Sequence, residues 1–348
     1  MESQAEYGLA VSAISPVDNY LDPARIRPIE HLPIREFDPE REELPAMPEL
    51  QPGPNRKVFH FHGISHWSDR MALHLKHVGI PYVFTSHGHL HFYGLLHGAK
   101  KAVYLNFFNS FIRQAEGLHF LTQREMERSR YILPGWHKKI LVQPNLVRLP
   151  NPDSINATSR DSLGIPRDAF VFVYLGRLDV RHKGLDLLLG AFSRLSPVRP
   201  VHLLLIGPDF AGGRKVLEDL AKKLGCEKRI HFTGSKVAPG KWELLKMADA
   251  FISPSRWEAF GIAMVEAIGF GLPTIVSDEI NFVKEVAAGR AAMISGVSAA
   301  ALAATMNRLM ADPALRRSLS ELGREWVLKT CSYAAAGPHF AEFYESVS

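Results

Sequence analysis

Cysteine is scarce in this chain: its 348 residues include only Cys226 and Cys331. The two lie in unrelated segments and form no CxxC motif, so the sequence predicts neither a disulfide framework nor a cysteine-based metal site. A reducing cytoplasm is the simplest compartment for such a protein.

Long apolar runs are also missing. No stretch of the sequence approaches the roughly 18 apolar residues that a membrane-spanning helix requires. The N-terminal segment MESQAEYGLAVSAISP is acidic at its start and lacks the basic region of a signal peptide. We therefore expect a cytoplasmic protein that is soluble or peripherally bound to a membrane.

Charge of one sign is not concentrated anywhere in the chain. The formal net charge is +5, and no block of consecutive Lys and Arg residues stands out. This mildly basic balance fits an anionic small ligand or an anionic membrane surface, and it does not indicate a nucleic acid partner. With 46% hydrophobic and 22% charged residues, the chain can form two well-cored domains.

Alternating strands and helices are what the sequence does contain, from Lys57 onward. Residues 1–55 are rich in proline and predict an arm with short extended pieces. Residues 56–150 and 151–330 each alternate strand and helix patterns, which is typical of a doubly wound parallel α/β domain. Residues 331–348 predict a C-terminal helix that packs back on the N-terminal domain. Two α/β domains joined by a linker predict a ligand cleft between them.

One stretch, SPSRWEAFGIAMVEAIGFGLPTIVSD, predicts a loop, a helix, a turn and a strand in that order. Glu258 falls in the loop and Glu266 on the helix, with seven residues between them. The start of a helix offers free backbone N–H groups and a positive dipole end, which suit a phosphate. Carboxylates would repel a phosphate, but they suit the neutral hydroxyls of a sugar and a ribose. A sugar nucleotide carries all of these groups.

Several segments, taken in order, resemble a retaining glycosyltransferase of family 4, the group 1 transferases with the GT-B fold. They are GIPYVFTSHGHL, YLGRLDVRHKGLDLLLGAF, HFTGS and ADAFISPSRWEAFGIAMVEAIGFGLPTIVSD, and the resemblance covers roughly residues 57–345. It implies an α/β protein of two Rossmann-like domains that face each other across a cleft. It also implies a nucleotide-diphosphate sugar as donor and no metal or other cofactor. The acceptor would be a glycan or a lipid-linked glycan in polysaccharide biosynthesis, at the inner face of the cytoplasmic membrane.

The resemblance implies a role for each matching residue. Arg177 and Lys183 follow one strand end and would stabilise the diphosphate leaving group. Glu258 would contact hydroxyls of the donor sugar, Glu266 would bind the ribose, and His87 would face the sugar. The residues implied at the donor are Gly176, Arg177, Lys183, Gly234, Ser235, Glu258, Phe260, Gly261, Ile262 and Glu266. Those implied in catalysis are His87, Glu258, Arg177 and Lys183, and those on the acceptor side are Gly63 and His66.

The chain departs from the family pattern at its start. Such transferases usually begin with a strand and a glycine-rich loop that approaches the donor phosphates, and nothing equivalent precedes His60. We therefore expect a shortened N-terminal domain. Ala259 and Leu146 also stand where the family often has glycine. A catalytically impaired relative that binds a nucleotide sugar is thus an alternative function.

The histidines suggest a different alternative, a metallohydrolase. His60 and His62 alternate along one strand, and residues 87–91 read HGHLH. This spacing resembles the HxHxDH ligand set of metallo-β-lactamase-like hydrolases. The aspartate of that set is missing, because Leu90 and His91 stand there instead. A sugar phosphorylase on the same fold would need a lysine in a pyridoxal-phosphate context, and the sequence has none evident.

Overall fold

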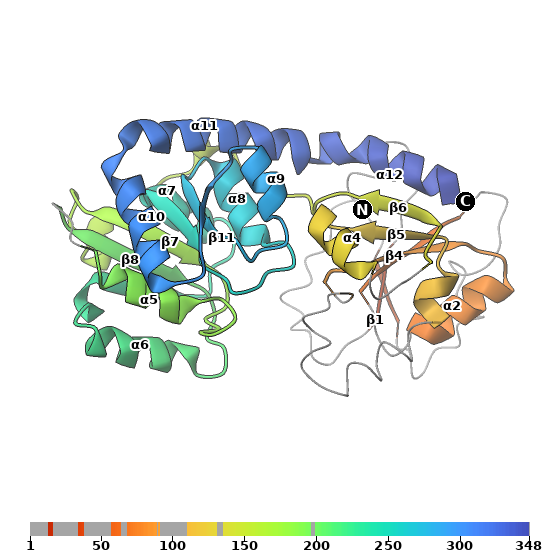
Figure 1. Ribbon diagram of the computed structural model, residues 1–348, viewed down its shortest axis with the longest axis horizontal. Helices are drawn as coiled ribbons and strands as arrows, with labels where there is room; N and C mark the ends of the chain where they lie inside the picture. Colours follow the sequence, from red (N-terminus) through yellow and green to blue (C-terminus); the bar gives the residue numbers. More distant parts are fainter. Residues whose placement is uncertain are drawn as a thin grey trace. The chain divides into compact units, whose positions relative to one another are not determined.

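The computed structural model describes residues 57–63, 68–88, 90, 110–130, 135–195 and 199–347, and the strands Ala13–Pro16 and Ile34–Phe37 (Figure 1). The chain forms two compact units: Met1–Pro144 with Tyr333–Ser348, and Asn145–Ser332. The first boundary therefore lies slightly before the predicted position between residues 150 and 151. The second lies just after the predicted position at residue 330.

The first unit contains a parallel sheet. Its strands are β3 (Phe59–His62), β4 (Tyr82–Thr85), β5 (Gly117–Phe120) and β6 (Lys139–Val142), in that order. The helices α2 (Ser68–His77) and α4 (Gln123–Ser129) belong to the same unit, as does the helical stretch 110–114. The apolar strand residues form a core with these helices, in which the Phe84 and Phe111 rings are fully buried.

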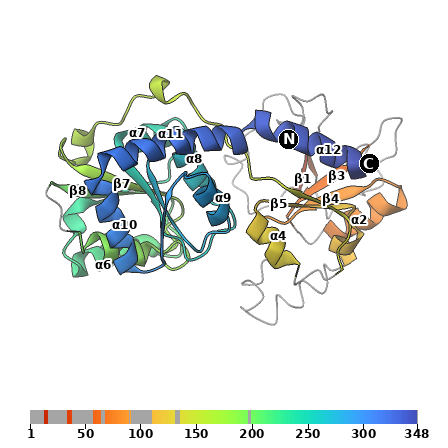
Figure 2. The ribbon, with the colours of Figure 1, turned by 45° about the horizontal axis from the view of Figure 1, so that its top comes forward.

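Helix α12 (Tyr333–Val347) is part of this first unit, although it ends the chain. It contacts β6 and lies along the sheet beside this strand, as Figure 1 shows, and Figure 2 shows the same helix over the sheet in a turned view. The close approach depends on a small residue, because a Cβ atom at Gly117 would lie 2.7 Å from Cζ of Phe343. The helix therefore completes one face of the sheet.

Two further short strands lie in the N-terminal arm. Strand β1 (Ala13–Pro16) pairs in parallel with β2 (Ile34–Phe37), with Ala13 opposite Ile34. They are extended pieces of the kind that the proline-rich composition predicts, but their pairing was not predicted. The rest of residues 1–56 lies outside the described residues, so a shortened N-terminal domain stays a prediction.

The second unit contains a larger parallel sheet. Its strands are β7 (Phe170–Leu175), β8 (Val201–Ile206), β9 (Ile230–Gly234), β10 (Ala250–Ser253), β11 (Thr274–Ser277) and β12 (Met293–Ser295). They lie in the order β12-β11-β10-β7-β8-β9. The chain thus runs outward from β7 on one side and from β10 on the other. Ligands of doubly wound sheets bind outside the carboxyl ends of the two strands at such a reversal.

Helices cover both faces of this sheet. They are α5 (Leu185–Phe192), α6 (Gly213–Lys223), α7 (Gly240–Met247), α8 (Ile262–Phe270), α9 (Val283–Ala288), α10 (Ala299–Ala311) and α11 (Pro313–Thr330). Short 3₁₀ turns lie at Pro152–Ser154, Arg160–Leu163 and Glu227–Arg229. Figure 1 shows α5 and α6 on one side of the sheet and α7 and α8 on the other. Helix α10 packs on α5, and α11 packs on α8. Cys226 and Cys331 are free and buried.

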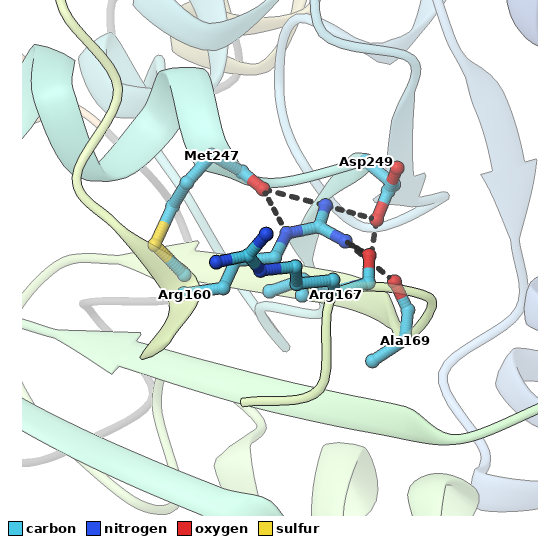
Figure 3. Close-up of polar contacts among 6 residues, drawn as sticks. Arg160, Arg167, Ala169, Met247 and Asp249 are labelled. Atoms are coloured by element: carbon cyan, nitrogen blue, oxygen red, sulfur yellow. Dashed lines mark hydrogen bonds and ion pairs between the residues drawn. The ribbon is translucent and has the colours of Figure 1, made fainter. Parts of the chain in front are cut away.

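The amino ends of β7 and β10 are fastened by a single arginine (Figure 3). The Arg160 guanidinium donates to the carbonyls of Ala169 at 2.7 Å and Met247 at 2.8 Å, and it pairs with Asp249 Oδ2 at 2.9 Å. The same Asp249 oxygen accepts from the Val171 N–H at 2.8 Å. Arg160 therefore has a structural role at the amino ends of these strands. The residues implied at the donor follow the carboxyl ends.

A chain of hydrogen bonds crosses the sheet of the first unit. Its contacts are Tyr344 Oη to His60 Nδ1 (2.6 Å), His60 Nε2 to Thr85 Oγ1 (2.5 Å), Thr85 Oγ1 to His119 Nδ1 (2.8 Å) and His119 Nε2 to the Gln143 carbonyl (2.8 Å). The carbonyl can only accept, so the neutral His119 ring donates from Nε2 and accepts from the Thr85 hydroxyl. Thr85 then accepts from His60 Nε2–H, and His60 accepts from the Tyr344 hydroxyl. All donors in the chain point the same way, from α12 to the end of β6.

These hydrogen-bonded histidines predict a pH dependence for the stability of the first unit. Burial lowers the pKa of His119 from 6.5 to about 4, and it also lowers the pKa of His60. The unfolded state therefore binds protons at a higher pH than the folded state does. Stability is complete above about pH 6.5 and is lost as the pH falls toward 4, by about 3 kcal/mol for His119 alone.

Hydrogen exchange of the β4 and β5 amides between pH 7.5 and 4.5 measures this loss. The variant His119→Gln removes the titrating ring, so its stability should fall less steeply with pH than that of the wild type. If stability fell equally steeply with pH in the two proteins, the buried His119 ring would not be the cause of the loss.

Candidate functional site

Most of the residues implied at the donor follow the carboxyl ends of β7, β9 and β10 in the second unit. Gly176 and Arg177 directly follow β7, Gly234 ends β9, and Glu258 lies in the loop after β10. These strand ends include the pair at which the strand order reverses. The fold therefore brings residues that are distant in the sequence together at the carboxyl ends of the strands of one sheet.

Lys183, in the loop after β7, and Glu258, in the loop after β10, form an ion pair. Their side chains are 15% and 18% exposed, so both charges are largely withdrawn from water. The Glu258 backbone is also held in place, because its carbonyl accepts the Asn281 N–H at 2.9 Å. A cation able to bind phosphate thus lies beside a carboxylate able to bind hydroxyls, at a place where charges interact strongly.

The loops after β7 and β10 touch each other closely. Gly184, the N-cap of α5, has φ of +65°, and a Cβ atom there would lie 2.1 Å from the Pro254 carbonyl oxygen. The Arg256 guanidinium forms a bidentate pair with Asp186, at 2.6 and 2.8 Å, and also donates to the Arg181 carbonyl at 2.8 Å. These contacts fix Lys183 and Glu258 on adjoining, mutually braced loops.

The start of α8 is suited to an anion. The N-cap is Gly261, with φ of +88°, and no side chain among the described residues caps this helix end. Ile262, the first helical residue, is 50% exposed. The ring of Phe260 is buried against that of Phe282, with centroids 4.6 Å apart, and this contact fixes the entry into the helix. The backbone N–H groups of the first turn can therefore serve a phosphate.

Glu266, on the second turn of α8, has a cationic partner that the sequence did not predict. Its Oε1 atom lies 2.6 Å from Lys241 Nζ on α7, and the two side chains are 14% and 19% exposed. The Lys241 ammonium also lies 4.5 Å from the centre of the Trp242 ring. Lys241 therefore holds the carboxylate of the residue implied at the ribose.

The remaining residues implied at the donor are more open. Arg177 is exposed, and its guanidinium lies over the Phe210 ring, 4.7 Å from the ring centre. The Gly234 carbonyl accepts the Gly207 N–H at 2.9 Å, which ties the end of β9 to the end of β8. Ser235 follows and is exposed. These side chains are available to a ligand, whereas both glutamates are engaged with lysines.

The other implied residues belong to the first unit. His87 follows β4 and has φ of +45°, and its Nε2 lies 3.1 Å from His62 Nδ1. The His62 ring stacks on His60, with centroids 4.3 Å apart. The Gly63 N–H donates to the Thr85 carbonyl at 3.1 Å, so Gly63 and His87 follow neighbouring strands. His66 lies outside the described residues.

Two further features concern the described part of the chain, a metal cluster and a membrane-spanning helix. Among those residues, no three His, Cys, Asp or Glu side chains gather in a way that could hold a metal ion. His89 and His91 of the HxHxH pattern lie outside them. No helix in the described ranges is long and apolar enough to cross a membrane.

Comparison with known proteins gives a family match for most of the second unit. Residues 156–326 match the family model of group 1 glycosyl transferases. The chain is 33% identical over 214 residues to the lipopolysaccharide core biosynthesis glycosyltransferase LpsD of Rhizobium meliloti, covering 61% of this chain and 59% of LpsD. It is 26% identical over 265 residues to the phosphatidyl-myo-inositol mannosyltransferase of Mycobacterium leprae, covering 68% and 69%.

The aligned part does not span the whole of every relative. It covers less than two thirds of LpsD, and 48% of the D-inositol 3-phosphate glycosyltransferase of Corynebacterium urealyticum, which is 27% identical over 57% of this chain. The activity of those proteins therefore comes to this chain only as a proposal.

Solved structures match over nearly the whole chain. Sucrose-phosphate synthase from Thermosynechococcus elongatus aligns with a TM-score of 0.74 at 21% identity, covering 99% of this chain and 90% of that one. HepE of Anabaena, in complex with UDP and glucose, aligns with a TM-score of 0.71 at 18% identity, covering 91% and 87%. The lipopolysaccharide glycosyltransferase WaaG aligns with a TM-score of 0.64 at 17% identity, covering 100% and 93%. These matches confirm the predicted GT-B fold.

Proposed function

We propose that this chain is a retaining, metal-independent glycosyltransferase of group 1 that uses a nucleotide-diphosphate sugar as donor. The observation that carries the proposal is the Lys183–Glu258 pair beside the uncapped start of α8, where the strand order reverses. The match of residues 156–326 to group 1 transferases supports it, as does the binding of UDP and glucose by HepE, a protein of the same fold.

Each donor group has a partner of suitable chemistry in the second unit. The diphosphate binds the Lys183 ammonium, the Arg177 guanidinium and the N–H groups of Gly261 and Ile262. Glu258 accepts from hydroxyls of the sugar, and Glu266 accepts from the ribose hydroxyls. The lysine partners orient both carboxylates, so each is placed to accept hydrogen bonds before the donor binds.

The proposed reaction is a front-face substitution at the sugar. The bond between the anomeric carbon and the β-phosphate oxygen breaks, and the acceptor hydroxyl oxygen bonds to the same face of that carbon. The acceptor proton passes to an oxygen of the leaving diphosphate, whose charge Lys183 and Arg177 stabilise. His87 positions the sugar and takes no proton. No metal or other cofactor is part of this scheme.

The acceptor in this proposal is a glycan or a lipid-linked glycan. Relatives named for lipopolysaccharide core biosynthesis and for mannosyl transfer to phosphatidyl-myo-inositol support this class of acceptor. A net charge of +5 would favour contact with an anionic membrane surface. We accordingly place the protein in the cytoplasm, peripheral to the inner face of the membrane.

A thermal-shift screen with UDP-, GDP- and ADP-sugars tests the proposal. At least one donor should raise the Tm of the wild type. The variant Glu266→Ala should bind that donor about 10- to 100-fold more weakly, because two ribose hydroxyls lose a charged acceptor. Glu321→Ala, an exposed helix position in the same unit, is the matched control and should bind like the wild type.

Two outcomes would change the conclusion. Absence of any donor-induced shift in the wild type would refute the transferase proposal. Tight donor binding with neither transfer nor donor hydrolysis would favour the catalytically impaired relative, for which the Ala259 and Leu146 departures are the sequence basis.

A further inference from the structure

Glu125 is a fully buried carboxylate in the first unit, on helix α4. Its Oε1 atom accepts the Ser86 hydroxyl and the Gly88 N–H, both at 2.6 Å, and its Oε2 atom accepts the Leu121 N–H at 2.8 Å. Three donors therefore converge on one side chain in an interior where an unpaired charge would be costly. Two of these donors flank His87 in the sequence.

His87 itself has an unfavourable backbone conformation. Its φ of +45° is uncommon for a residue that carries a side chain, and Gly88 follows with φ of +82°. Such conformations persist only where surrounding contacts impose them, and they concentrate at functional sites. The contacts on either side of His87 are those of Glu125, and the imidazole meets His62 at 3.1 Å.

We propose that Glu125 is a positioning residue that holds the turn Ser86–His87–Gly88 and thereby aims the His87 imidazole. The importance of that aim for catalysis rests on the proposed function, in which His87 faces the donor sugar. The helix that carries Glu125 is itself fixed at its start, because the Thr122 hydroxyl accepts the Glu125 N–H at 3.1 Å. Hydrogen bonds therefore hold the turn after β4 against the start of α4.

A carboxylate with an acceptor oxygen on each side is the group that matches this geometry. The two backbone N–H groups can only donate, so a proton on Oε2 would oppose the Leu121 N–H, and a proton on Oε1 would require the Ser86 hydroxyl to turn and accept it. Burial raises the pKa of Glu125, and the hydrogen bonds from Ser86, Leu121 and Gly88 only partly offset this rise. A glutamine amide can accept on one side only, so its NH₂ group must face either Leu121 or the Ser86–Gly88 pair.

The variant Glu125→Gln tests the proposal with three readouts. We expect kcat to fall about 10- to 100-fold, since small misplacements of a catalytic group have effects of this size. Donor affinity should change much less than kcat, because the partners proposed for the diphosphate, the ribose and the sugar hydroxyls lie in the second unit, and only His87 of the first unit is proposed at the sugar. In NMR spectra of ¹⁵N-histidine protein, the His87 imidazole resonances should shift. Glu127→Gln, the same change on the same helix, is the control and should leave all three readouts unchanged.

A lower Tm with kcat and the His87 resonances as in the wild type would mean a purely structural role and would overturn the proposal. If Glu125→Gln does not fold, Ser86→Ala replaces it, because it removes one donor and leaves the carboxylate in place; the same shift of the His87 resonances is expected. The resonance readout needs no turnover, so it decides the role of Glu125 even if the wild type transfers no sugar. A wild type that binds no donor would instead refute the proposed function.

Discussion

Replacing Lys183 by methionine should lower kcat for sugar transfer by about 10²- to 10³-fold, while the second unit stays folded. Methionine keeps the length of the apolar stem and removes the ammonium that pairs with Glu258 and that we propose stabilises the leaving diphosphate. The loss is largest in the transition state, because negative charge on the diphosphate grows as the glycosidic bond breaks. Steady-state kinetics with the donor identified by thermal shift measure the effect.

The matched control for this variant is Lys215→Met on α6. The Lys215 side chain is 71% exposed and its ammonium pairs with Asp219 one helical turn away, so its loss should leave kcat within about twofold of the wild type. The double variant Lys183→Met/Glu258→Gln should be less impaired than the product of the two single effects, since the pair is coupled. If Lys183→Met retained near wild-type kcat, Lys183 would not be the group that stabilises the leaving diphosphate.

The substitution Gly184→Ala should destabilise the second unit by about 5 kcal/mol. Two causes add: the backbone is in the left-handed region, and the new Cβ would lie 2.1 Å from the Pro254 carbonyl oxygen. Relief requires the loops after β7 and β10 to move apart, which would also separate Lys183 from Glu258. Calorimetry should show the Tm of this unit lower by roughly 10 °C or more.

Gly164→Ala separates the two causes. Gly164 has the same backbone angles as Gly184, φ of +65° and ψ of 27°, but a Cβ atom there has nothing within 4 Å. Its substitution should therefore cost only the conformational part, about 1 kcal/mol. If both variants lost the same stability, the close approach of the two loops would carry no energetic weight.

The parts of the fold that follow from local patterns could be predicted. The apolar runs that form β7 to β11 and the glycines and prolines that end them indicate a doubly wound sheet. The spacing of Glu258 and Glu266 around a helix start indicates a site for phosphate and hydroxyls. Strand ends and helix starts are local features, so a single sequence contains them.

Other features depend on contacts between distant segments, and no local pattern reports them. Lys241 is one of several lysines on short helices, and only the packing of α7 beside α8 brings it to Glu266. Glu125 looks like a solvated helix residue, since its charge says nothing about its burial. The donor direction of the hydrogen bonds from Tyr344 to Gln143 can be assigned only when the partner of every ring nitrogen is known.

The division of the chain has a consequence for its synthesis. The second unit is continuous, from Asn145 to Ser332, whereas the first unit needs α12 from the far end of the chain. A ribosome therefore makes most of the first unit early but cannot complete it until α12 emerges. Domains usually fold in the order in which they are made. Here the second unit can reach its native state first, while the Gly117 face of the first sheet waits for Phe343.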